Sequence, residues 1–155
     1  MLKLILGLFI VFSSALIGLH FSQRLTERKR ILLEFSALLK KAEVMISYSA
    51  ADLCKVFSDN FADYQFIYGE PFDAQWAELV NKYKSLLNDE DISVLTGFAQ
   101  GIGATDTDNQ SLHIGMYISL LDERIGSTNK DIEEKSKLYR VLPLSAGLML
   151  AILLI

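Results

Sequence analysis

Two long segments of this chain carry apolar residues at three- and four-residue spacing, and each predicts an amphipathic helix. The first covers residues 26–48, with apolar positions at Leu32, Phe35, Leu39, Ala42 and Ile46, widened by Ile31, Leu38 and Met45. The second follows residue 107, with positions at Ile114, Ile118, Leu121, Ile125, Ile132 and Tyr139, and polar gaps at Thr128 and Lys135. No strand-like alternation of useful length occurs, so the pattern predicts an all-α fold.

Both ends of the chain are apolar enough to be read as membrane spans. Lys3 is the only charge in residues 2–19, and residues 141–155 carry none. At about 1.5 Å per residue, the first segment crosses most of a roughly 30 Å hydrocarbon core. The second is shorter, and a slightly thinned bilayer would accommodate it. We expect terminal transmembrane helices at residues 2–21 and 141–155, flanking a helical domain at residues 22–140.

Two other interpretations of these ends stay open. A cleaved secretory signal has small residues near its cleavage site, and Ser13, Ser14 and Ala15 fit that loosely. The basic residues that follow the span resist translocation and argue against cleavage. The second end could instead be a buried core helix, although no polar face supports that interpretation.

Basic residues gather on the inner side of both spans and predict the orientation of the chain. They are Arg24, Arg28, Lys29, Arg30, Lys40 and Lys41 after the first span, and Lys130, Lys135, Lys137 and Arg140 before the second. Because positive residues stay in the cytoplasm, we expect the middle of the chain there and both termini on the opposite side. Cys54 is the only cysteine, which excludes an intramolecular disulfide and suits a reducing compartment.

The two long helices are expected to pack against each other in opposite directions. No proline or glycine lies between Leu19 and Tyr48, so the first span should continue into the first amphipathic helix. The last helix should run into the second span, with Pro143 tolerated or causing a slight kink. Their apolar spacing is that of coiled-coil packing. The alternative is that each apolar stripe packs on the shorter helices between them.

Small residues mark a candidate contact between the two spans. Ser14 and Gly18 lie four apart in the first span, and Ala146 and Gly147 lie in the second, beside Ser145. Small side chains let transmembrane helices approach closely. We expect packing at these positions, within one chain or between chains.

Shorter elements are predicted between the long helices. The pattern favours helices at residues 52–61, at residues 74–87, and from Asn88 to about residue 101. A break is expected at residues 68–71, because proline restricts the residue before it and Gly69 can supply the turn. The acidic residues that follow Asn88 favour the start of a helix through its dipole.

Residues 101–110 are predicted to form a corner between two helices. Gly101 or Gly103 can adopt a left-handed C-cap, and Thr107 with Gln110 matches a capping box. Asp106 has two interpretations: it is the true N-cap, or it is exposed for a partner. Gly103, Asp106 and Gln110 are therefore candidates for a corner or a docking site.

The sequence signal for a ligand-binding site at this corner is weak. Asp106, Asp108 and His113 form a loose metal-ligand set, and capping already explains part of it. A phosphate loop would need GxxxxGK[ST], or a strand before GxGxxG, and neither occurs. We find no nucleophile with a base elsewhere, so the sequence predicts neither an enzyme nor a bound metal or cofactor.

Charge is distributed unevenly along the chain. Residues 22–48 and 124–140 are net basic, whereas residues 49–123 are strongly acidic, with lysines only at positions 55, 82 and 84. The acidic region is either a solvated surface or a docking surface for a basic cytoplasmic partner. Its charge disfavours nucleic acid as a partner.

Several motifs carry a resemblance to a known family over essentially the whole chain. They are MLKLILG at the start, RLTERKR after the first span, Leu38, Leu39, Glu43 and Ile46 in the first helix, Trp76, the spacing of Gly103, Asp106 and Gln110, and Gly147 in the apolar tail. In their order and spacing the chain resembles the stage III sporulation protein AB family of endospore-forming bacteria. Family members often carry a Thr-Pro-Leu-Pro-like stretch where this chain has residues 49–53, so the shape of that turn is not predicted.

The resemblance implies a non-enzymatic protein of the mother-cell membrane, part of the channel joining mother cell and forespore. It implies a helical cytoplasmic domain similar to the platform protein of type II secretion and type IV pilus machines. The implied partners are other channel subunits and a cytoplasmic secretion-type ATPase, and self-association stays open. The alternative function is a membrane-anchored regulatory adaptor whose acidic domain binds a soluble cytoplasmic protein.

Overall fold

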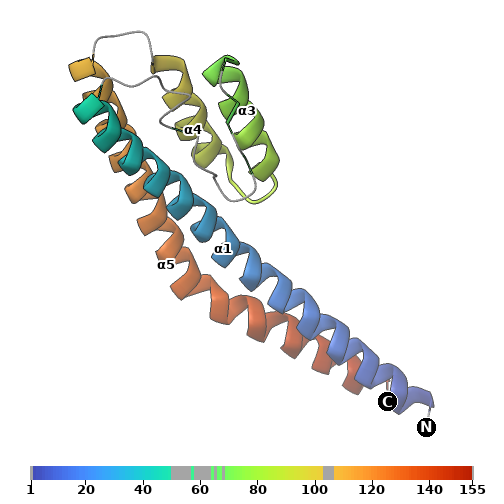
Figure 1. Ribbon diagram of the computed structural model, residues 1–155. Helices are drawn as coiled ribbons and strands as arrows, with labels where there is room; N and C mark the ends of the chain where they lie inside the picture. Colours follow the sequence, from blue (N-terminus) through green and yellow to red (C-terminus); the bar gives the residue numbers. More distant parts are fainter. Residues whose placement is uncertain are drawn as a thin grey trace. The chain divides into compact units, whose positions relative to one another are not determined.

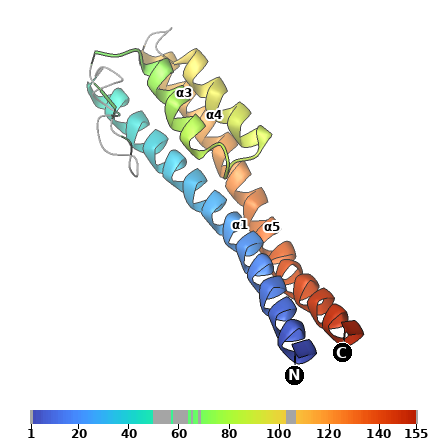
Figure 2. The same ribbon diagram turned by 90° about the vertical axis from the view of Figure 1, so that its right-hand side faces the viewer.

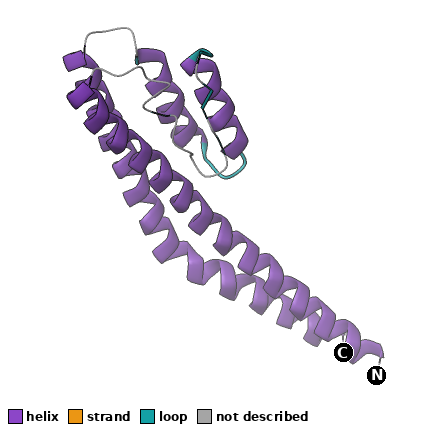
Figure 3. Cartoon of the chain, viewed as in Figure 1, coloured by secondary structure: helices purple, strands orange, loops and turns teal. Residues whose placement is uncertain are grey.

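The computed structural model contains α-helices and no strand in the part of the chain that it describes (Figure 3). That part comprises residues 2–49, 57, 64, 66–67, 69–102 and 107–154. Its helices are α1 (Leu2–Ser49), α3 (Phe72–Tyr83), α4 (Asp89–Gly101) and α5 (Thr107–Leu154). The prediction of an all-α fold is confirmed for these residues. Of the short helix expected at residues 52–61, only Phe57 is described.

The bounds of the helices agree with the sequence pattern in part. α1 is one uninterrupted helix, as predicted, and α5 continues through Pro143. α3 begins at Phe72, earlier than expected, because Pro71 at the N-cap position needs no N–H and costs the helix nothing. It also ends early, at Tyr83, whose carbonyl oxygen accepts from the N–H groups of residues 86 and 87 at 2.9 and 3.3 Å.

The chain divides into two compact units. The terminal unit combines Met1–Lys29 with Ser127–Ile155, and the central unit is Arg30–Gly126. In the terminal unit, the blue part of α1 and the red part of α5 lie side by side in two perpendicular views (Figures 1 and 2). The Phe21 and Tyr139 rings are 5.8 Å apart, and Arg28 pairs with Asp131. Within this unit the two helices therefore run antiparallel.

Aromatic packing around Trp76 forms the core of the central unit. Trp76 is fully buried, and its Nε1–H donates to Leu95 O at 2.7 Å. Its ring lies 5.5 Å from Phe35 of α1 and 4.8 Å from Phe98 of α4. The apolar stripe of α1 thus packs on the shorter helices. Most of both predicted stripes is buried: Ile31, Leu32, Phe35, Leu38, Leu39, Ala42, Ile46, Ile114, Ile118, Leu121 and Ile125.

Polar contacts join α1 to α5 within the central unit. Asp122 accepts a hydrogen bond from Ser36 Oγ at 3.0 Å and pairs with Lys40 Nζ at 3.1 Å. Nearer the end of α1, Glu43 Oε1 would lie 3.1 Å from a Cβ added at Gly115. Residues with higher numbers in α1 thus contact residues with lower numbers in α5, so the two helices run antiparallel here. Both sequence alternatives therefore hold here, because α1 contacts α5 as well as α3.

The segment before α3 is fixed by a glycine and a buried glutamine. Gly69 has φ +94°, a left-handed conformation that favours glycine, and this confirms the predicted break. Gln75 is almost fully buried. Its amide accepts from Ile67 N–H at 2.5 Å and donates to the carbonyl oxygens of Ile67 and Glu70 at 3.0 and 3.3 Å. This clamp was not predicted from the sequence.

Candidate functional site

The predicted corner between α4 and α5 is only partly visible. Gly103 and Asp106 lie outside the described residues, and Gln110 lies in the first turns of α5, half-buried. α5 begins at Thr107, and the hydrogen bonds of the predicted capping box lie outside the described residues. The left-handed cap at Gly101 is wrong, because α4 runs through Gly101 and ends on an extended Ile102 (φ −80°, ψ 141°).

Gly101 serves a close approach between helices instead. Gly97 and Gly101 lie four apart on α4, and Tyr117 and His113 lie four apart on α5. A Cβ added at Gly97 would lie 2.8 Å from the Tyr117 hydroxyl oxygen, and one at Gly101 would lie 2.9 Å from His113 Nε2. The aromatic side chains of α5 therefore fill the space that both glycines leave open.

His113 acts as a packing residue and as a hydrogen-bond donor. Its Nε2 lies 3.1 Å from Phe98 O, and the carbonyl acceptor implies that Nε2 carries the proton. Phe98 is among the last four residues of α4, whose carbonyl groups lack partners within the helix. No group of His, Cys, Asp and Glu suited to a metal ion occurs among the described residues. His113 thus supplies a C-terminal contact to α4 from the neighbouring helix.

The start of α4 is fixed by a buried carboxylate. Asp91 is fully buried and forms a capping box with Asn88, which was not predicted: Asn88 Oδ1 accepts from Asp91 N–H, and Asp91 Oδ2 accepts from Asn88 N–H. Asp91 Oδ1 also accepts from Arg124 Nε at 3.0 Å. Burial lowers the pKa of the Arg124 guanidinium, but bonding to Asp91 and Glu90 outweighs burial and leaves this pKa above its ordinary value. Arg124 of α5 therefore holds the start of α4 against α5 through ion pairs with Asp91 and Glu90.

The predicted membrane-proximal basic cluster is divided by internal ion pairs. Arg28 is buried, and its Nη1 lies 3.7 Å from Asp131 Oδ2. Arg30 belongs to the central unit, where it bonds to Glu34 at 2.8 Å. Arg24 is exposed and Lys29 is half-exposed. The side chain of Arg140 lies outside the described residues.

Asp131 links this cluster to α5. Its second oxygen, Oδ1, lies 2.5 Å from Lys135 Nζ. This hydrogen bond, with the attraction of the Asp131 charge, raises the pKa of the exposed Lys135. Asp131 therefore contacts two cations from different helices.

Two of the predicted small residues meet in the terminal unit. A Cβ added at Gly147 would lie 2.9 Å from Ser14 Cβ, 3.4 Å from Val11 Cα, and closer still to Ser14 Oγ. Gly18 is buried, whereas Ala146 is exposed. The structure brings Ser14 and Gly147 together and leaves Ala146 out of this contact.

The terminal unit exposes much apolar surface. One helical segment among the described residues, Leu6–Ile46, is long and apolar enough to cross a membrane, and only 17% of its most apolar window is buried. The exposed large apolar side chains of this unit are Leu6, Leu8, Phe9, Phe12, Leu16, Ile17, Leu19, Phe21, Leu138, Val141, Leu142, Leu144, Leu148, Met149, Leu150, Ile152 and Leu153. Exposure of so many large apolar side chains in one unit is typical of a membrane or protein contact.

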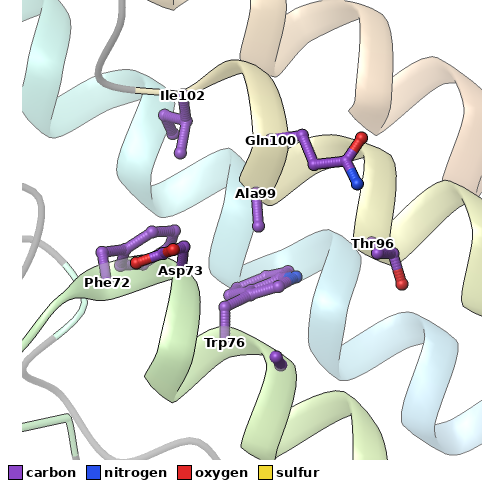
Figure 4. A pocket seen from close by; sticks show the side chains of 8 residues that line it. Phe72, Asp73, Trp76, Thr96, Ala99, Gln100 and Ile102 are labelled. Carbon is purple, nitrogen blue, oxygen red and sulfur yellow. The ribbon is translucent and has the colours of Figure 1, made fainter.

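A groove lies between α3 and α4 in the central unit (Figure 4). Its volume is about 470 Å³, and it is lined by Phe72, Asp73, Trp76 and Ala77 of α3 and by Thr96, Ala99, Gln100 and Ile102 beside them. We call it the α3–α4 groove. The sequence analysis missed it, because its lining comes from two helices whose facing residues cannot be paired from spacing alone.

Comparison with known proteins gives one match. The model of the family described as stage III sporulation protein AB matches residues 3–155, which is essentially the whole chain. No curated protein and no solved structure matches the chain. The family match covers both the terminal unit and the central unit.

Proposed function

This chain belongs to the stage III sporulation protein AB family, and we propose that it is a non-enzymatic platform subunit of the channel between mother cell and forespore. The family match carries this proposal. It extends over residues 3–155, so the link to sporulation rests on the whole chain and not on one domain. A platform subunit needs an anchor in the membrane and a surface for a cytoplasmic partner. The terminal and central units are candidates for these two parts.

We assign the membrane anchor to the terminal unit. Its α1 segment is apolar and largely unburied, which is unlike a core helix, and the last turns of α5 expose apolar side chains throughout. Both ends would then cross the mother-cell membrane that faces the forespore. Basic residues on the inner side of both segments favour a cytoplasmic central unit and termini on the opposite side.

We assign the docking surface for a secretion-type ATPase to the central unit. Its helices α3 and α4 expose the carboxylates Asp73, Glu78, Asp89 and Glu90, and Glu70 is exposed just before α3. A surface of this charge favours a basic partner and speeds encounter with it. Other channel subunits would bind the terminal unit within the membrane.

Cysteine accessibility tests the orientation. In a Cys54→Ser background, Lys82→Cys places one thiol on an exposed position of α3. A membrane-impermeant maleimide should label it only after the cells are permeabilised, because the central unit is cytoplasmic. Labelling in intact cells would show that the central unit lies outside the cytoplasm, and would contradict the proposed orientation.

Affinity capture tests the partner. The full chain, tagged at its N-terminus and extracted in mild detergent from sporulating cells, should bring down a secretion-type ATPase together with membrane subunits of the channel. A soluble protein captured without any channel subunit would favour the regulatory adaptor instead.

A further inference from the structure

We propose that the α3–α4 groove binds a helix of a cytoplasmic partner that presents a bulky aliphatic side chain with a lysine or arginine one turn away. This inference rests on the proposed function, since it names the surface and the chemistry by which the central unit holds its partner. The groove lies entirely within the central unit.

The shape of the groove suits an aliphatic anchor. Trp76 lies between the two helices, with Ala99 of α4 beside it (Figure 4). Ala77 of α3 also lines the groove, and each of the two alanines contributes only a methyl group. Small side chains on both walls above an aromatic floor leave room for a branched aliphatic group. The volume of about 470 Å³ falls within the range of about 300–1,000 Å³ that is usual for binding pockets.

Phe72 and Ile102 extend the apolar lining towards one end. Phe72 is half-buried and Ile102 is buried, so the apolar lining is already held in place by the core. Preformed apolar surface lowers the ordering cost of binding. The two parallel ridges of α3 and α4 also match the way in which an amphipathic helix lies in a groove.

The one charged residue that lines the groove, Asp73, favours a partner with a positive charge. Asp73 lines the groove, is exposed, and has no ion-pair or hydrogen-bond partner among the described residues. Thr96 and Gln100 lie one turn apart on the exposed edge of α4 and offer neutral hydrogen bonds. The nearest lysine on α3 is Lys82, in the last turn, at the opposite end of the helix from Asp73. A basic partner therefore meets a carboxylate without a partner among the described residues, and the lysine of this helix lies at its far end.

Charge also argues against two other occupants. A second copy that presented its acidic residues 49–123 would be repelled by Asp73. An anionic lipid headgroup meets the same repulsion. Both occupants remain distinguishable outcomes of the experiment.

The direct test is peptide binding to the full chain in detergent micelles. The probe is a synthetic amphipathic helix of leucines with lysines one turn away; the controls replace its lysines by glutamate or its leucines by serine. Trp76 is the only tryptophan, so its fluorescence reports binding at the groove. We expect the glutamate and serine peptides to bind at least about ten-fold more weakly than the probe.

Two variants locate the binding. Ala99→Leu fills the groove and should weaken binding of the probe at least about ten-fold. Asp73→Asn should weaken it about two- to five-fold and reduce its salt dependence. The matched control is Glu123→Gln, which also removes an exposed carboxylate of the central unit but lies on α5 outside the groove, and it should change nothing.

The outcomes separate this inference from the proposed function. Equal binding of probe and glutamate peptide, unchanged binding by Ala99→Leu, or binding that shifts only the self-association of the chain would overturn the groove assignment. If Ala99→Leu still captures the ATPase from cells as well as the unaltered chain, the groove is wrong and the platform function stands. If the peptides behave as expected but the unaltered chain captures no ATPase, the platform function fails and the groove stands.

Discussion

Replacing Gly101 by alanine should destabilise the central unit, because the His113 side chain of α5 fills the space beside this residue. A Cβ at Gly101 would lie 2.9 Å from Nε2 and 3.0 Å from Nδ1 of His113, and closer still to Cε1. The imidazole ring therefore has to move. It is held by stacking on Phe98 at 5.9 Å and by packing on Tyr117 at 4.8 Å between ring centroids, so the movement breaks existing contacts.

Three contributions set the size of the effect. Overpacking of this kind costs about 1–3 kcal/mol. Displacing His113 also weakens its hydrogen bond to Phe98 O, which is worth about 1 kcal/mol. Against these, alanine is favoured over glycine in a helix by at most about 1 kcal/mol, and less at the last residue of α4. We expect the free energy of unfolding to fall by about 1–3 kcal/mol.

Urea unfolding of the full chain in detergent measures this change. Trp76 fluorescence follows the transition, since its ring lies 4.8 Å from Phe98, the neighbour of His113. The matched control is Gly126→Ala on α5, where an added Cβ meets nothing within 4 Å. That substitution should stabilise the chain by about 0.5–1 kcal/mol, because only helix propensity changes.

A double-mutant cycle identifies the cause. In a His113→Ala background the obstacle is gone, so Gly101→Ala should be neutral or slightly stabilising. The reasoning is refuted if Gly101→Ala stabilises the unaltered chain as much as Gly126→Ala does. It is also refuted if Gly101→Ala costs the same free energy in both backgrounds.

Three further predictions concern other contacts of the central unit. Arg124→Met should lower the free energy of unfolding by about 3 kcal/mol, since it leaves the buried Asp91 carboxylate without its cation, and Asp91→Asn should restore much of the loss in urea unfolding. Gly69→Ala should lower the free energy of unfolding by about 1–2 kcal/mol, because φ is +94° at this residue. Gly69→Val should lower it by a similar amount if backbone strain is the cause. Burial, then the hydrogen bond and charge of Glu78, raises the pKa of Tyr64 to about 12. The stability that Tyr64 contributes is thus present below about pH 10 and lost as the pH rises towards 12; Glu78→Gln should lower this pKa in an absorbance titration, and an unchanged titration would contradict the assignment.

Helical periodicity predicted the parts of the fold that one helix encodes by itself. Leu32, Phe35, Ile114 and Leu121 are buried where the apolar stripes placed them, because a 3.6-residue period fixes which side chains share a face. The start of α4 after Asn88 was likewise predicted from local sequence and was confirmed, whereas the capping box that fixes it was not predicted.

The sequence pattern did not predict which residues of different helices contact each other. The role of Gly101 was misread because this residue looked like a left-handed cap, whereas its lack of a side chain makes room for His113 from another helix. Spacing offered no way to pair Arg124 with Asp91, since any of the neighbouring acids on α4 was an equal candidate. The pair Gly97 and Gly101 was a usable signal, because small residues four apart often mark a close helix contact.

Site-specific photo-crosslinking in sporulating cells tests the platform function most directly. A photo-reactive amino acid replaces the exposed Glu78 on α3 of the full chain, and in a second strain it replaces the exposed Leu153 near the end of α5. A platform subunit with a cytoplasmic central unit predicts a product containing the secretion-type ATPase from position 78 and none from position 153. If exposed positions across α3 and α4 all fail to capture the ATPase in cells that contain both proteins, or if position 153 captures it, the proposed function is contradicted.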